Sequence, residues 1–316
     1  MKFLTIIIAV SILKLTGFRE LIHQDRWYFS FQKRWLSPNE ASENRLLLLG
    51  ILLPALVIAA VLGWLQGALF GVIGLAANLL VLLYCFGRGD LPVQIANYLE
   101  KLKAGDFESA RYSAIESSLL SEEADLHDIH SLNHEVLSGL IYQQFSRVFL
   151  VLFWYLALGV FGALFICFAA LIQQTNDEAR RPDHLVSRFL VAAEWIPVRI
   201  LAFTFGLIGN FESVYQSYKK SVDEYEFGDK TMSAQRVLKN CGFAALEFQF
   251  EDNSELTAGE GEVGEKSDEK GDGELHDLNG YIRSVEQVEH TERMLVRSLV
   301  IWLAGVSVLT LTGWFS

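Results

Sequence analysis

Long apolar runs alternate with polar segments along the chain, and this alternation indicates its architecture. A helix needs about 20 apolar residues to cross a bilayer, and four runs meet that length: 46–64, 68–86, 148–172 and 296–315. The link between the first two is so short that they must form a helical hairpin. No segment alternates apolar and polar residues as a half-buried strand would. The pattern predicts an all-α, polytopic helical membrane protein with cytoplasmic helical segments.

Two other apolar runs are ambiguous. Residues 3–13 form a short run with no small-x-small cleavage site after it, so we expect a short uncleaved anchor or interfacial helix. Residues 189–211 are long enough to span but contain Glu194, Pro197 and Arg199, within EWIPVRILAFTFG. A soluble core helix is one interpretation of this run. The continuous apolar stretch after Arg199 favours a membrane-embedded helix.

The segments between the runs suggest an orientation. Residues 14–45 are basic and rich in aromatic residues, which is typical of a cytoplasmic segment beside a membrane span. The hairpin then leaves residues 87–147 in the cytoplasm, although Arg180, Arg181 and Arg188 in the predicted outer loop count against this orientation.

The predicted regions are an anchor with a basic aromatic segment (1–45), a transmembrane hairpin (46–86), a cytoplasmic helical region (87–147), transmembrane helices with the EWIPVR motif (148–211), a cytoplasmic region (212–294) and a last transmembrane helix (295–316).

The cytoplasmic region 87–147 reads as a series of helices. Apolar residues recur at near-helical spacing in LPVQIANYLEKLKAG. Gly105 suits the end of that helix and Asp106 suits the N-cap of the next one, DFESARYSAIESSL.

The net charge of −12 is concentrated in one segment. Between Glu251 and Asp277 there are eleven acidic residues and two lysines, which alone give −9. With little to bury, residues 251–280 are predicted to be a disordered acidic insert. The rest of the chain is nearly neutral and has no basic footprint for nucleic acid.

The chain lacks the common motifs for phosphate-binding loops, dinucleotides, metalloproteases and serine hydrolases, so we expect no cofactor. His127, His130 and His134 share one helical face. They are either a metal site or the polar face of a cytoplasmic helix, and we favour the second because nothing else points to a metal. Cys85, Cys167 and Cys241 have no metal-binding spacing and are predicted to be apolar filler.

The EWIPVR motif is the main candidate for a functional site. Glu194 and Arg199 are about 140° apart around a helix and are poor partners for each other. Pro197 has no N–H, so it frees the carbonyl of Ala193. Ionisable residues within a span are candidate functional sites. The motif therefore marks either an unwound position that lines a cavity or the first turn of a helix at the interface.

A polar pocket follows from the first of these alternatives. Glu194, Trp195 and Arg199 would form it, and Arg199 would be the charge partner of an anionic ligand. Five further residues could complete the pocket at the cytoplasmic membrane face: Arg88, Asp90, Asp106, Arg111 and Glu135.

Several of these phrases resemble the AmpE family. They are LFWYLALGVFGALFICF, AAEWIPVRILAFTFGLIGN and, in the helical region, LPVQIANYLEKLKAGDFESARYSA. The AmpE proteins are in turn similar to the CobD/CbiB membrane enzymes of cobalamin synthesis, which share the Trp-x-Pro-x-Arg phrase. The acidic phrases of those enzymes are missing here, since the chain reads FAALIQQTND and SGLIYQQFSRVF at the matching places. The departure favours the AmpE branch.

The resemblance implies a regulatory protein of the bacterial inner membrane that modulates β-lactamase induction. Its partners would be the bilayer, a cell-wall-derived or other anionic ligand, and a second membrane protein. Two alternatives stay open: a membrane synthase or transferase with CobD/CbiB-like chemistry, and a protein-docking module without a ligand.

Overall fold

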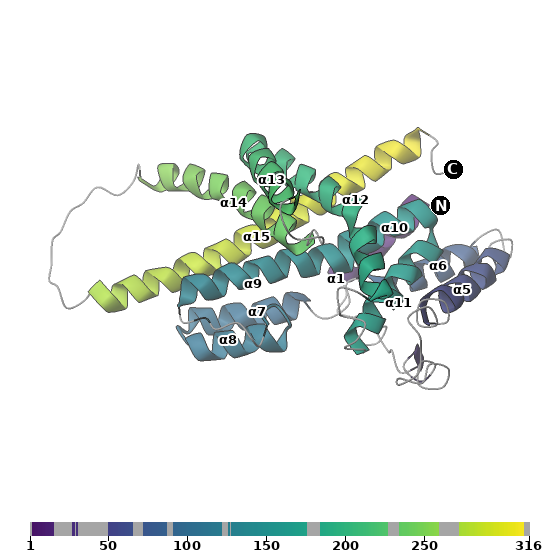
Figure 1. Ribbon diagram of the computed structural model, residues 1–316, viewed down its shortest axis with the longest axis horizontal. Coiled ribbons are helices and arrows are strands. Elements are labelled where there is room, and N and C mark those ends of the chain that lie inside the picture. Colours follow the sequence, from purple (N-terminus) through teal and green to yellow (C-terminus); the bar gives the residue numbers. More distant parts are fainter. Residues whose placement is uncertain are drawn as a thin grey trace. The chain divides into compact units, whose positions relative to one another are not determined.

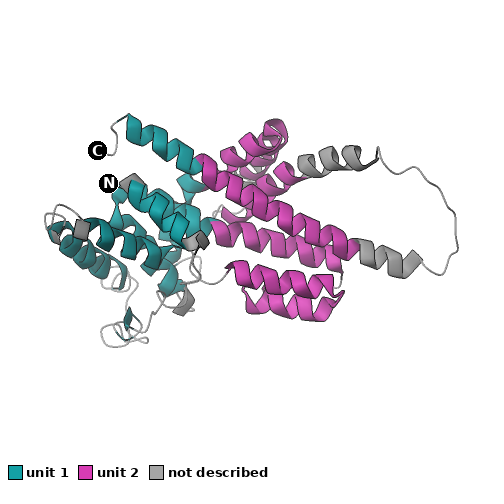
Figure 2. Ribbon diagram, turned by 180° about the vertical axis from the view of Figure 1, so that it is seen from behind, with its two compact units in different colours: residues 1–89, 145–197, 302–316 teal, residues 90–144, 198–301 magenta. Residues whose placement is uncertain are grey.

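A computed structural model shows a helical chain (Figure 1). It describes residues 2–15, 27–28, 30, 50–65, 72–86, 91–121, 126, 128–175, 184–226, 234–258 and 272–312. Within these ranges the regular elements are helices and no strand is present, so the predicted all-α fold class is confirmed. The chain folds into two compact units (Figure 2). Unit 1 consists of residues 1–89, 145–197 and 302–316, and unit 2 of residues 90–144 and 198–301.

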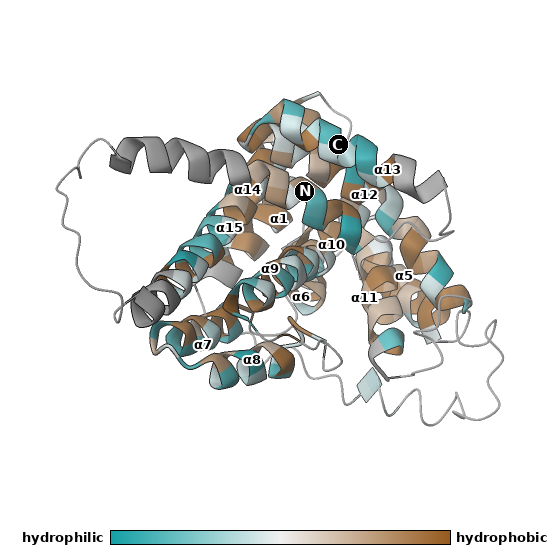
Figure 3. Ribbon diagram, turned by 60° about the vertical axis from the view of Figure 1, so that its left-hand side comes forward, coloured by the Kyte–Doolittle hydropathy of each residue, from teal (hydrophilic) through white to brown (hydrophobic). Residues whose placement is uncertain are grey.

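Unit 1 is built from apolar helices that pack on one another. Its first elements are α1 (Lys2–Leu15), α5 (Leu53–Leu65) and α6 (Val72–Cys85), and α11 (Val160–Thr175) contacts both α5 and α6. Figure 3 shows apolar residues along most of α5 and α6. Each of these two helices is shorter than the predicted span, since a helix of 13 or 14 residues rises only about 20 Å.

Part of the basic aromatic segment belongs to the core of unit 1. Tyr28 is fully buried, its ring stacks on Phe168 at 4.7 Å, and its hydroxyl donates to the Gly50 carbonyl at 2.7 Å. Tyr28 is therefore a core residue of unit 1, and the predicted cytoplasmic position of residues 14–45 remains a prediction. The hydrogen bond explains how a phenol is accommodated in an apolar core.

The single helix predicted over 148–172 is two helices. α10 (Leu150–Leu158) ends at Gly159, and α11 begins at the next residue and packs against α10. Gly159 has a φ of 68°, a conformation that glycine adopts without the steric cost of a side chain. The turn was missed because Gly159 lies inside an unbroken apolar run, without the polar residues that mark most turns.

Three helical stretches within the described residues are long and apolar enough to cross a membrane: Ile129–Leu158, Leu185–Ile208 and Gly280–Leu311. The first combines α9 (Ile129–Gln144), η3 (Phe145–Phe149) and α10. The second is α12 (Leu185–Ile208), and the third lies in α15 (Asp272–Leu311). The predicted membrane-embedded helix at 189–211 and the last span at 296–315 therefore correspond to long apolar helices.

Unit 2 begins with a hairpin of two amphipathic helices, α7 (Leu91–Lys103) and α8 (Phe107–Glu116). Gly105 has a φ of 70°, and the Asp106 carboxylate accepts from the Ser109 N–H at 3.0 Å. The predicted helix stop and N-cap are both confirmed. These local signals were readable because a left-handed turn and a capping carboxylate need particular residue types.

The segment after α8 fits closely against α9. Gln143 donates to the carbonyls of Ser117 and Ser118, at 3.2 and 2.6 Å. A side chain at Gly139 would overlap the Leu119 carbonyl, so glycine permits the close approach.

α13 (Phe211–Glu226) packs along α14 (Ala234–Ala258), which in turn packs on α9. Asn240 donates to the Ser221 hydroxyl at 2.9 Å, and Cys241 is fully buried with its sulfur 4.0 Å from the Val214 carbonyl oxygen. None of the three cysteines forms a disulfide, and all three are buried.

The helices α14 and α15 extend into both ends of the predicted acidic insert 251–280. α14 continues to Ala258 and α15 begins at Asp272. The central part, 259–271, lies outside the described residues, so its predicted disorder remains a prediction.

Candidate functional site

The EWIPVR motif lies in the middle of α12, and the helix is continuous through it. α12 has 24 residues, and Pro197 lies twelve positions after its first residue. Pro197 therefore marks neither an unwound position nor a first turn, and both alternatives drawn from the sequence are wrong. An interior proline is costly because it removes one backbone hydrogen bond and leaves the carbonyl four residues earlier without its amide.

The carbonyl released by Pro197 has a replacement donor. The indole Nε1 of Trp154, on α10, donates to the Ala193 carbonyl oxygen at 3.2 Å. This bond connects two of the longer phrases that carried the family resemblance, LFWYLALGVFGALFICF and AAEWIPVRILAFTFGLIGN. The sequence predicted the acceptor, but the donor is 39 residues away and gave no local signal.

A groove lies between the second half of α12 and α13, within unit 2. Its volume is about 290 Å³. The residues that line it are Arg199, Ala202, Phe203 and Gly206 of α12, and Phe211, Val214, Tyr215 and Tyr218 of α13. α12 and α13 are joined by only Gly209 and Asn210, and Gly206 lies close to the ring of Phe211. Gly206 and Phe211 form the part of the lining nearest to the tip of this helical hairpin.

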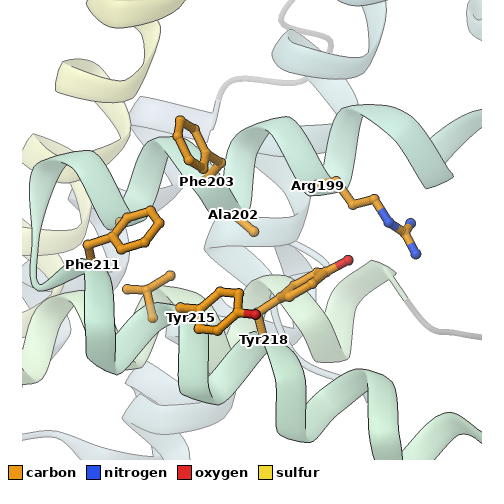
Figure 4. A pocket seen from close by; sticks show the side chains of 8 residues that line it. Arg199, Ala202, Phe203, Phe211, Tyr215 and Tyr218 are labelled. Atoms are coloured by element: carbon orange, nitrogen blue, oxygen red, sulfur yellow. The ribbon is translucent and has the colours of Figure 1, made fainter.

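The groove is aromatic at one end and polar at the other. Phe203 meets Phe211 edge to face at 5.6 Å, and the Phe211 and Tyr215 rings are stacked at 6.3 Å. Figure 4 shows the hydroxyls of Tyr215 and Tyr218 pointing toward the end at which Arg199 lies. Those three side chains supply the polar side-chain atoms of the described lining.

The other members of the predicted pocket have different surroundings. Glu194 is buried and Trp195 is about half exposed, and neither lines the groove, although they share α12 with Arg199. Both belong to the part of α12 assigned to unit 1, whereas Arg199 belongs to unit 2. Arg88 and Asp90 lie outside the described residues.

Asp106, Arg111 and Glu135 do not line the groove either. Asp106 is exposed and caps α8, and the hydrogen bonds that it accepts from Ser109 lower the pKa of its carboxyl. Arg111 is part of α8. Glu135 pairs with Lys239 of α14 at 2.5 Å, which joins α9 to α14.

No group of three metal-ligating side chains occurs among the described residues. His134 stacks on Phe243 of α14 at 4.4 Å, which suits a side chain that packs between helices. His127 lies outside the described part of the chain.

The tyrosines of α13 were not predicted as site residues. Their signal was present, because Phe211, Tyr215 and Tyr218 follow the spacing i, i+4, i+7 and so share one helical face. That spacing alone does not distinguish a groove from an ordinary packed core, since both are lined by such a face.

Comparison with known proteins shows the family of the chain. Residues 1–244 match the family described as regulatory signalling modulator protein AmpE. The chain belongs to the AmpE family. A protein from Shigella flexneri named Protein AmpE is 24% identical over 168 residues, which are 51% of this chain and 59% of that relative. The chain thus spans under two thirds of the relative's length. No solved structure matches.

The match covers the residues that carried the resemblance, including EWIPVR and the Leu-Phe-Trp phrase. The description of that family names a regulatory signalling role, and three described helices are long and apolar enough to cross a membrane. The further likeness to the CobD/CbiB enzymes stays a prediction from the quoted motifs.

Proposed function

We propose that this chain is a multi-pass protein of the bacterial inner membrane that modulates β-lactamase induction under cell-wall stress. It does so by binding an anionic ligand in the groove between α12 and α13, with Arg199 as the charge partner. Membership of the AmpE family supports the regulatory role. The position of Arg199 at the polar end of a groove whose other walls are apolar or aromatic is the observation that supports a ligand.

The geometry suits binding better than turnover. A guanidinium has a planar fork of donors that matches phosphate and carboxylate groups. Tyr215 and Tyr218 add two hydroxyls that can donate to the same anion. Among the described residues that line the groove there is no carboxylate, imidazole or thiol to act as base or nucleophile. A sensor is therefore favoured over the synthase or transferase alternative.

The test uses a strain that lacks the chromosomal copy and is complemented with wild type, Arg199→Gln or Arg188→Gln. Arg188 is the matched control, because it is an exposed arginine of the same helix that does not line the groove. β-Lactamase activity is measured before and after exposure to an inducing β-lactam, with membrane levels checked by immunoblot.

We expect Arg199→Gln to shift induction toward the value of the strain that lacks the protein, and Arg188→Gln to behave as wild type. Wild-type induction in both variants would overturn the role of the groove. Equal induction with and without the protein would overturn the regulatory role itself.

A further inference from the structure

The groove has a chemical gradient along its length. Toward the tip of the α12–α13 hairpin, its walls are Phe203, Gly206 and Phe211. Toward the other end they are Arg199 and Tyr218, and Lys219 and Lys220 follow directly on α13 as exposed cations. A ligand that matches both ends has an anionic head and an apolar tail.

The surface around the groove is also apolar. Phe203 is 55% exposed, Leu207 57% and Tyr215 56%, and Phe211 is exposed as well. A cluster of large exposed apolar side chains is typical of a surface that contacts lipid or another apolar partner. Because α12 is also apolar and long enough to cross a membrane, lipid is the surrounding phase that this surface fits.

A water-soluble glycopeptide fits the groove poorly. Such a molecule carries many hydroxyls and amides, and each polar group buried without a hydrogen bond costs free energy. Within the described lining, only the side chains of Arg199, Tyr215 and Tyr218 offer polar atoms. An acyl chain, in contrast, gains from burial in proportion to the apolar surface removed from water.

We propose that the ligand of the groove is an anionic membrane lipid. Its phosphate group binds Arg199 beside the tyrosine hydroxyls, and one of its chains lies along Phe203 and Phe211. The volume of about 290 Å³ is at the small end of ligand sites. The groove therefore holds the phosphate group and only the first part of one chain, while the rest of the lipid stays in the bilayer. This inference rests on the proposed function, because it names the ligand class of the same site.

The experiment measures thermal unfolding of the full chain, purified in a neutral detergent. Four probes are compared: phosphatidylglycerol, phosphatidylcholine with the same chains, glycerol 3-phosphate as the headgroup alone, and a soluble muropeptide. Wild type is compared with Arg199→Gln, with Arg188→Gln as the charge control, and with Ala202→Leu. The last variant keeps Arg199 but fills the groove from its α12 wall.

We expect phosphatidylglycerol to raise the midpoint of wild type and Arg188→Gln by about 5 °C at saturation. The same lipid should change the midpoint of Arg199→Gln and Ala202→Leu by less than about 1 °C. Phosphatidylcholine and glycerol 3-phosphate should have little effect on any variant, because each lacks one of the two required parts. If Arg199→Gln does not fold, the Ala202→Leu result decides.

Equal shifts by both lipids, unchanged in the variants, would show only general solvation by lipid and would overturn the inference. A shift by the muropeptide or the headgroup alone would also overturn it, but would leave the proposed sensor role in place. Loss of the lipid shift in Arg199→Gln together with normal β-lactamase induction in cells would support lipid binding and overturn the proposed function.

Discussion

The two halves of α12 differ in how the protein accommodates a local defect. A missing hydrogen bond in the first half is replaced, and a groove beside the second half is left open. In the first half, the Ala193 carbonyl lacks its helical partner because Pro197 has no N–H, and the Trp154 indole donates to this carbonyl at 3.2 Å instead. In the second half, aromatic side chains border a groove of about 290 Å³ that no residue of the described lining fills. The missing hydrogen bond is replaced by another residue of the chain, whereas the groove stays open. We expect a groove to stay open when it binds an external molecule.

The largest effect is expected from Trp154→Phe, which removes the indole donor and keeps an aromatic ring. The Ala193 carbonyl then loses its replacement partner, so we expect the free energy of unfolding to fall by about 1 to 2 kcal/mol. Unfolding in mixed detergent micelles measures the change. Trp195→Phe is the matched control, because Trp195 is about half exposed on the same helix and should change stability by less than about 0.5 kcal/mol. Equal effects of the two variants would show that the indole bond contributes nothing.

A smaller effect is expected for the coupling between Trp154 and Pro197. In Pro197→Ala the residue regains an N–H that can bond to the Ala193 carbonyl within the helix. Trp154→Phe should therefore cost less in that background, by about 1 kcal/mol in a double-mutant cycle. Additive costs would contradict the view that the indole substitutes for the missing amide.

The smallest effect is expected for Ala202→Leu in the groove. Ala202 is buried but lines the groove, so the added carbon atoms enter the groove, and the stability of the ligand-free protein should stay within about 0.5 kcal/mol of wild type. Ala245→Leu is the control, because Ala245 is fully buried in α14 and overpacking a tight core costs about 1 to 3 kcal/mol. Similar losses in both variants would show that the groove is closed in solution and would remove the contrast between the two halves of α12.

Local chemistry could be predicted from the sequence to the extent that one or two residues determine it. Gly105 and Asp106 specify a helix stop and a cap by themselves, and both were found where expected. The proline effect on the Ala193 carbonyl was also predictable. The helix nevertheless continues through Pro197, because a tryptophan from another helix compensates for the lost bond, and such a compensation depends on the tertiary packing.

Of the predicted pocket residues that the structure describes, Arg199 is the one that lines the groove. A charge within an apolar run is visible in the sequence, whereas its neighbours depend on how α13 turns back along α12 after Gly209 and Asn210. The break at Gly159 was hidden for a related reason. In an apolar environment a turn does not require polar residues, so composition does not reveal it.

The burial of Cys241 makes α13 a segment whose movement can be observed chemically. Burial raises the pKa of the Cys241 thiol to about 12, so at neutral pH about one molecule in 10⁵ carries the thiolate that reacts with maleimides. Labelling then requires α13 to separate from α14, because the sulfur faces the Val214 carbonyl in that contact. Val214 also lines the groove. The rate at which Cys241 is alkylated therefore reports how often one wall of the groove opens.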